Sequence, residues 1–169
     1  MSEATSTVTV RPAAEGDLEA LGRLAAQLVR LHHEWDAARF LVVEPIEEGY
    51  RWWLGRELSN KNAVILVAVD SAANGAPVVG YAYGRLEERD WNALLDAHGA
   101  LHDIFVDATQ RGRGAARQLL EAMIARLGEL GAPRVVLHTA SQNEAAQRLF
   151  RAAGFRPTMI EMTRETQKT

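Results

Sequence analysis

Hydrophobic residues along the chain recur with two periods, one typical of helices and one typical of strands. Spacings of three and four residues predict helices at residues 18–33, 46–58, 114–130 and 141–153. Alternating or continuous apolar runs of strand length predict strands at residues 7–11, 62–69, 78–86, 101–106, 135–138 and 158–164. Helices and strands that follow one another along a single chain indicate a mixed α/β domain.

The composition is that of one ordinary globular domain. The 169 residues include 47% hydrophobic and 24% charged residues, so we expect a single domain over residues 1–169. Residues 1–6 are mostly polar and are expected to be disordered. A net charge of −3 and a pI near 6.0 argue against a general nucleic-acid binder. The sequence shows no cysteine, signal peptide or membrane-length apolar run, so a cytoplasmic protein without membrane attachment is the expectation.

The most informative stretch begins with the predicted strand that ends at Val106. A turn follows, which reads Gln-Arg-Gly-Arg-Gly-Ala over residues 110–115 and contains Gly112 and Gly114. Glycine permits a positive φ and a close approach of a ligand to the backbone. The predicted helix starts directly from this turn, and the free N–H groups of a helix N-terminus favour an anion such as a phosphate. The spacing of a dinucleotide fingerprint or a P-loop is missing, so an ordinary strand-to-helix loop is the alternative.

A second motif lies further along the chain. It runs from Asn143 through Ala146, Leu149 and Phe150 to a Gly-Phe pair at residues 154–155. In this order, the two motifs resemble the Q/R-x-x-G-x-G/A and N-x-x-A-x-x-L-Y-x-x-x-G-F signatures of the GNAT N-acetyltransferases. The resemblance implies a mixed, mostly antiparallel, twisted sheet of six to seven strands, splayed between strands four and five, with about four helices on its two faces.

The resemblance also implies a binding mode for acetyl-CoA, the co-substrate of that family. Its pyrophosphate would lie on the turn formed by Arg111, Gly112, Arg113, Gly114, Ala115 and Ala116. Its pantetheine arm would follow free backbone groups of Phe105 and Val106, with Asn143 beside it. Asn143 is equally suited to cap a helix, and solvated arginines are the alternative for the two arginine side chains. Phe150 stands where many members carry a tyrosine that protonates the leaving thiolate, which phenylalanine cannot do.

The reaction implied by the resemblance is direct attack of an amine on the thioester, without an acyl-enzyme. A protonated amine must first lose its proton, and His102 is the candidate for the base or for a water relay. A histidine that only fills the cleft is the alternative. Strand alternation predicts His102 and Asp103 on opposite faces. Asp103 is a candidate to hold the substrate ammonium, or a structural carboxylate, and the main-chain N–H of Val106 is the expected oxyanion donor.

Acidic and aromatic residues gather in residues 32–53 and 87–98, the segments that build the acceptor cleft in the family. The expected acceptor contacts are Glu34, Trp35, Glu87 and Tyr81, and solvated acids with core aromatic residues are the alternative. An acidic, aromatic cleft suits a cationic small molecule such as a polyamine, an amino acid or an amino sugar. The neighbouring histidines at residues 32–33 have no second cluster at ligand spacing, so no metal is expected.

Two other functions stay open at this point. The first is that of a catalytically weak protein that binds acyl-CoA as a sensor, and Phe150 is the residue that suggests it. The second is acetylation of protein lysines or N-termini. Dimers are common among the family that the chain resembles, so a homodimer is left open.

Overall fold

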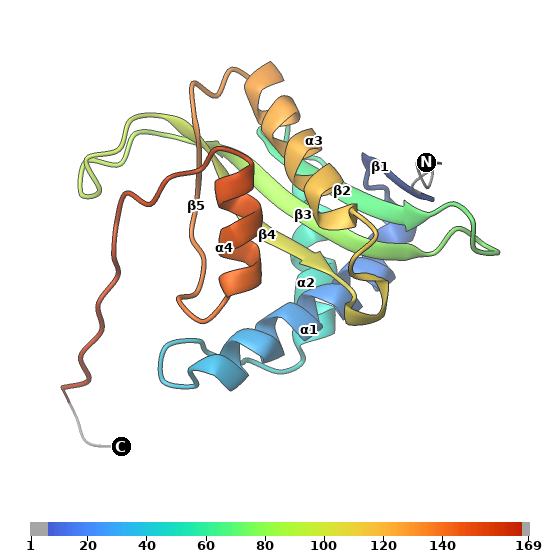
Figure 1. Ribbon diagram of the computed structural model, residues 1–169, viewed down its shortest axis with the longest axis horizontal. Coiled ribbons are helices and arrows are strands. Elements are labelled where there is room, and N and C mark those ends of the chain that lie inside the picture. Colours follow the sequence, from blue (N-terminus) through green and yellow to red (C-terminus); the bar gives the residue numbers. More distant parts are fainter. Residues whose placement is uncertain (1–6, 167–169) are drawn as a thin grey trace.

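The structure is a computed structural model that describes residues 7–166 (Figure 1). The expected disorder of residues 1–6 lies outside this range. In chain order, the helices and strands are β1 (Val8–Pro12), α1 (Leu18–Trp35), α2 (Ile46–Glu57), β2 (Ala63–Asp70), β3 (Val78–Glu87), β4 (His98–Val106), α3 (Ala115–Glu129), β5 (Val135–Leu137) and α4 (Glu144–Ala152). The predicted helices and the first five predicted strands are therefore confirmed, with small shifts at their ends. No helix within residues 7–166 has the length and hydrophobicity needed to cross a membrane.

The strands form one sheet in the order β1-β2-β3-β4-β5. Neighbours from β1 to β4 are antiparallel, whereas β4 and β5 are parallel. Pairing of β4 with β5 stops at Leu101 opposite Leu137, although β4 continues to Val106. The two strands therefore separate beyond Leu101, at the place where the family resemblance implies a splay.

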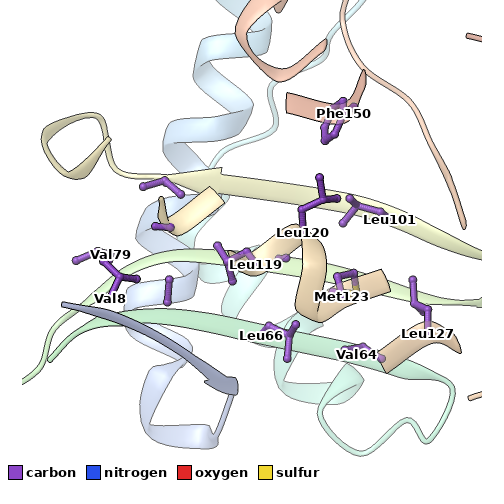
Figure 2. Close-up of a cluster of buried hydrophobic side chains, with 14 residues drawn as sticks. Val8, Val64, Leu66, Val79, Leu101, Leu119, Leu120, Met123, Leu127 and Phe150 are labelled. Atoms are coloured by element: carbon purple, nitrogen blue, oxygen red, sulfur yellow. The ribbon is translucent and has the colours of Figure 1, made fainter. Parts of the chain in front are cut away.

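Helices cover both faces of the sheet (Figure 1). On one face, α1 and α2 form a buried cluster with β2 and β3 that includes Leu21, Leu24, Leu54, Ile65, Val67, Tyr81 and Tyr83. On the other face, α3 lies over β2 and β3, and Figure 2 shows its buried side chains Leu119, Leu120, Met123 and Leu127. Phe150 of α4 joins this second cluster. Each helix thus turns an apolar stripe toward the sheet, as its residue spacing predicted.

The predicted final strand at residues 158–164 is wrong, and the sheet has five strands instead of six to seven. After α4 the described chain runs in an extended path away from the body (Figure 1). Met159, Ile160 and Met162 are 81–90% exposed, so the alternating pattern there covers no apolar surface. The edge strand β5 is three residues long and offers few backbone groups to a further strand.

Gly84 lies where β3 and β4 come too close for a side chain. A Cβ here would lie 2.7 Å from the carbonyl oxygen of Ala100 and 2.9 Å from Sδ of Met123. We expect Gly84→Ala to lower the free energy of unfolding by about 1–3 kcal/mol, the usual cost of overpacking.

Gly128 in α3 is the matched control, because a Cβ at its position meets no described atom within 4 Å beyond its chain neighbours and the backbone of its own helix. Gly128→Ala should raise the free energy of unfolding by about 0.5–1 kcal/mol, since alanine is the better helix former. Urea unfolding measures both variants. If the free energy of unfolding changes in the same direction in both variants, the close packing assigned to Gly84 is contradicted.

Candidate active site

Strand β4 carries a β-bulge at His102. Tyr83 of β3 lies opposite Asp103, and the next residue, Gly84, lies opposite Leu101, so His102 is an extra residue in the register. An extra residue of this kind interrupts the alternation of side chains along a strand. The prediction that His102 and Asp103 lie on opposite faces is therefore wrong.

Both side chains lie against tyrosines of β3 on the face that α1 and α2 cover. The ring of His102 stacks on that of Tyr83, with centroids 5.4 Å apart and 24° between the planes. Asp103 accepts a hydrogen bond of 2.9 Å from the hydroxyl of Tyr81. Tyr81 and Tyr83 belong to the same buried cluster. The bulge thus brings a candidate base and a carboxylate to one side of β4, next to the point where β4 leaves β5.

The imidazole of His102 is oriented by Glu87 at the end of β3. Its Nε2 lies 3.0 Å from Oε1 of Glu87. Because a carboxylate only accepts, this contact assigns the ring proton to Nε2 and leaves the lone pair of Nδ1 free to take a proton. Glu87, an expected acceptor contact, thus lies beside the ring of the candidate base.

Burial raises the pKa of Asp103 above its usual range, and the hydrogen bond from Tyr81 offsets part of that rise. Burial also raises the pKa of Tyr81. The pKa of Tyr50 is raised by burial and, to a smaller extent, by the nearby charge of Asp103. Both phenols therefore stay protonated at neutral pH.

Asp103→Asn is expected to be more stable than the parent protein at neutral pH. Because the folded pKa of Asp103 lies above the unfolded value of about 3.9, its stabilising contribution is complete below that value and is lost as the pH rises through the folded pKa. Asparagine has no charge to bury, and its side-chain oxygen can still accept from Tyr81. Urea unfolding should give similar stabilities at acid pH and a difference that grows toward neutral pH. A difference that shrinks with rising pH would contradict the raised pKa.

A pocket of about 320 Å³ opens between α1, the loop that follows it, β4 and α4. Its polar lining consists of His32, Arg39, Tyr50, His102, Asp103, His138, Thr139 and Asn143. Among these described lining residues, Asp103 is the only carboxylate, against one arginine and three histidines. The lining is therefore more basic than the acidic cleft that the sequence led us to expect.

All four expected acceptor contacts, Glu87 included, lie outside this lining, and their roles stay predictions. Glu34 is exposed on α1, and Trp35 packs against the ring of His32 with centroids 5.0 Å apart. Tyr81 is fully buried beneath Asp103. The sequence reasoning assigned no role in the site to Arg39 or Tyr50. Arg39 lies in a loop without a periodic hydrophobic pattern. The only sequence feature that could have indicated a role in the site is its position within residues 32–53, one of the expected acceptor segments.

The neighbouring histidines at the end of α1 make separate contacts. Nδ1 of His32 lies 2.9 Å from the carbonyl oxygen of Leu28. Nδ1 of His33 lies 2.7 Å from the carbonyl oxygen of Phe40. In the described part of the chain, no group of three or more His, Asp or Glu side chains is arranged to hold a metal ion.

Backbone groups of β4 face the gap between β4 and β5. In an antiparallel ladder, alternate residues direct their N–H and C=O groups toward the partner strand and away from it. The hydrogen bond of 2.9 Å from the N–H of Asp107 to the carbonyl oxygen of Val79 shows which residues of β4 face β3. Ile104 and Val106 therefore direct their N–H and C=O groups away from β3, whereas the N–H and C=O groups of Phe105 point toward β3. The N–H of Val106 has the direction expected of the oxyanion donor, but the expectation of free backbone groups at Phe105 is wrong.

The turn after β4 has left-handed backbone at both glycines. The φ angle is 80° at Gly112 and 81° at Gly114, which is the N-cap of α3. No side chain within residues 7–166 caps this helix, so the N–H groups of Ala115 and Ala116 are directed outward. Helix N-termini of this kind are suited to phosphate binding.

The two arginines of the turn differ in their contacts. Nη1 of Arg113 lies 2.6 Å from Oδ2 of Asp70 at the end of β2, and this hydrogen bond lowers the pKa of Asp70. The guanidinium of Arg111 lies 5.8 Å from the ring centroid of Phe105. Arg113 thus ties the turn to the sheet, and a direct role of either arginine at the phosphates stays a prediction.

Asn143 and Phe150 belong to the same pocket. Asn143 caps α4, since its side-chain oxygen accepts a bond of 3.2 Å from the N–H of Ala146. Phe150 is buried and lies edge-on to Phe155, with ring centroids 6.0 Å apart. The position at which many family members carry a tyrosine is therefore an apolar wall of the pocket here.

A splayed sheet, a glycine turn on a helix N-terminus and a polar bulge between them define the class of CoA-dependent acyltransferases. Residues 27–155 match the acetyltransferase (GNAT) family, and the chain belongs to this family. Its members are acetyltransferases that use acetyl-CoA as co-substrate.

The chain is similar to proteins of several activities. It is 39% identical over 93 residues to an L-methionine sulfoximine/L-methionine sulfone acetyltransferase of Pseudomonas paraeruginosa. The aligned residues cover 54% of this chain and 49% of the relative. The chain thus spans about half the length of the curated relatives that it matches. A tetramutant of the BH1408 protein from Bacillus halodurans has a TM-score of 0.76 at 21% identity, over 93% of this chain and 99% of that one. The aminoglycoside N-acetyltransferase AAC(6')-Iy in complex with CoA has a TM-score of 0.71 at 18% identity, over 99% and 100% of the two chains.

Proposed function

We propose that this protein transfers the acetyl group of acetyl-CoA directly to the primary amine of a small molecule, in a complex that holds both substrates. The observation that carries the proposal is the position of the bulge. His102 and Asp103 line a pocket at the place where β4 leaves β5. The same strand continues to Val106 and then to the glycine turn, so one segment can serve both the thioester and the phosphates.

In the proposed reaction, the acceptor amine gives its proton to Nδ1 of His102, directly or through water. Its nitrogen then bonds to the thioester carbonyl carbon, and the oxyanion accepts from the N–H of Val106. Glu87 stabilises the imidazolium through Nε2. Collapse of the tetrahedral intermediate breaks the C–S bond and releases the thiolate, which takes the surplus proton of the amide nitrogen directly or through water, so that the products are the neutral amide and CoA thiol. Phe150 has no proton to give, but a thiol pKa of about 8.5 makes the thiolate a tolerable leaving group.

The size and charge of the pocket support a small acceptor. Its volume of about 320 Å³ is at the small end of the range of ligand pockets. A lining with one arginine and one carboxylate does not favour a polyamine, which carries only positive charge. The Pseudomonas relative is an acetyltransferase for amino-acid analogues. We therefore place amino acids and their analogues ahead of polyamines and of protein lysines or N-termini.

A sensor that binds acyl-CoA with little turnover is the second candidate. Phe150 favours it, because phenylalanine lacks the hydroxyl of the tyrosine that the family resemblance implies at this position. Thiol release from acetyl-CoA with a panel of amino acids, amino sugars and polyamines separates the two functions. Turnover with one class of amine supports the transferase. Tight CoA binding in a calorimeter without turnover on any amine supports the sensor, and no CoA binding rejects both.

A further inference from the structure

Arg39 is the arginine of the pocket lining, and the proposed reaction does not use it. It lies in the loop between α1 and α2 and lines the pocket together with His102 and Asp103. Its guanidinium is bound by one carboxylate, that of Glu161 in the segment after α4. Nε donates to Oε1, and Nη2 donates to Oε2 at 2.9 Å. Two parallel bonds of this kind are the geometry in which arginine recognises a carboxylate.

This ion pair is open to exchange. The side chains of Arg39 and Glu161 are 42% and 60% exposed. Because exposed ion pairs add little to stability, a second carboxylate can replace Glu161 at small cost. The hydrogen bond from Arg39 holds the pKa of Glu161 below its usual range, so Glu161 is charged at neutral pH.

The segment that carries Glu161 makes few other contacts. Residues 156–166 are all exposed, including Met159, Ile160 and Met162. Within the described chain, Glu161 is the residue of this segment whose side chain is hydrogen-bonded to the body. Release of Arg39 would therefore free the segment without loss of buried apolar surface.

The pocket is polarised in a way that suits a zwitterion. Asp103 and the free Nδ1 of His102 suit the ammonium group and its proton. Arg39 supplies the fixed positive charge, and His32 and His138 also line the pocket. An amino acid carries an amine and a carboxylate a few bonds apart, which matches these two kinds of group.

We propose that Arg39 binds the carboxylate of an amino-acid acceptor and that Glu161 occupies Arg39 until the acceptor displaces it. This inference rests on the proposed function and adds to it a selection for acceptors that carry a carboxylate beside the amine. Glu161 acts as an internal competitor. It raises the KM for such acceptors and leaves kcat unchanged.

Arg39→Gln and Glu161→Gln test the proposal with matched pairs of acceptors. Each pair is an amino acid, L-methionine sulfone among them, and the amine that remains when its carboxylate is removed. Arg39→Gln should raise the KM of the amino acid about tenfold or more, as for loss of a charged hydrogen bond, with kcat unchanged. Glu161→Gln should lower that KM about two- to fivefold, the range of an exposed ion pair. Neither variant should change the KM of the matched amine.

Arg30→Gln is the matched control, because Arg30 forms an exposed ion pair of 3.2 Å with Glu44 and does not line the pocket. It should leave the KM of both acceptors unchanged. The inference is overturned if Arg39→Gln affects both acceptors equally, if Glu161→Gln raises the KM of the amino acid, or if amines without a carboxylate are the better substrates. Absence of thiol release with every acceptor would reject the proposed function instead. Calorimetric titration of the amino acid into the same variants would then still test Arg39.

Discussion

His102→Ala is expected to lower kcat about 100-fold or more, the usual contribution of a positioned general base, and to leave the affinity for CoA unchanged. The acceptor amine would then have to lose its proton to water. The pH profile of kcat/KM should also change, because the general base of the proposed reaction is lost. Initial rates of thiol release from about pH 5 to pH 9 measure both effects.

Glu87→Gln is the graded control for this prediction. Glutamine keeps the size of the side chain and an oxygen that can accept from Nε2 of His102, but it loses the charge that stabilises the imidazolium. We expect its kcat to lie between those of the parent and of His102→Ala. If His102→Ala keeps the parental rate and pH profile, the histidine only fills the cleft.

The glycine turn and the helix caps could be predicted because their signals are local. Gly112 and Gly114 stand between an apolar strand and an amphipathic helix, and both adopt the positive φ that the turn requires. Asn143 directly precedes α4 and caps it. In each case the neighbouring residues alone determine the conformation. The opening between β4 and β5 was expected only from the family resemblance, since no residue pattern marks where two strands separate.

The arrangement of His102 and Asp103 could not be predicted, because it depends on the register between two strands. Alternation along β4 assumes an uninterrupted ladder with β3. The bulge at His102 lies beside Gly84 of the partner strand, where the absence of a side chain lets the carbonyl oxygen of Ala100 come close. A glycine within a strand is a signal for such an irregularity, but it does not say which residue of the partner strand becomes the extra one.

The charge of the pocket also depends on contacts between distant residues. Several acids of the expected acceptor segments are paired with arginines outside the pocket, as in the ion pair between Asp96 and Arg89. Arg39 enters the lining from a loop, and its partner Glu161 is 122 residues away. Counting charges by segment therefore did not predict which charged groups line the pocket, because the count takes no account of which side chains face inward.

The double replacement of Gly112 and Gly114 by alanine is expected to weaken CoA binding about tenfold or more, which corresponds to about 1.4 kcal/mol. Both residues have φ near 80°. An alanine held there costs about 1–2 kcal/mol, so the turn is expected to shift toward negative φ. The N–H groups of Ala115 and Ala116 would then point away from the place proposed for the pyrophosphate. Titration calorimetry with CoA measures the Kd.

Gly131→Ala is the matched control, at the other end of α3. Its φ is 95°, and a Cβ there meets no atom of the described chain within 4 Å, as is also true of Gly112. The strain is of the same kind, so Gly131→Ala should lower the free energy of unfolding by about 1 kcal/mol and leave the Kd for CoA unchanged. Weaker binding in both proteins would indicate general destabilisation. Unchanged binding in the double variant would mean that the turn does not hold the pyrophosphate, because the backbone N–H groups are the contacts that the proposed binding mode requires.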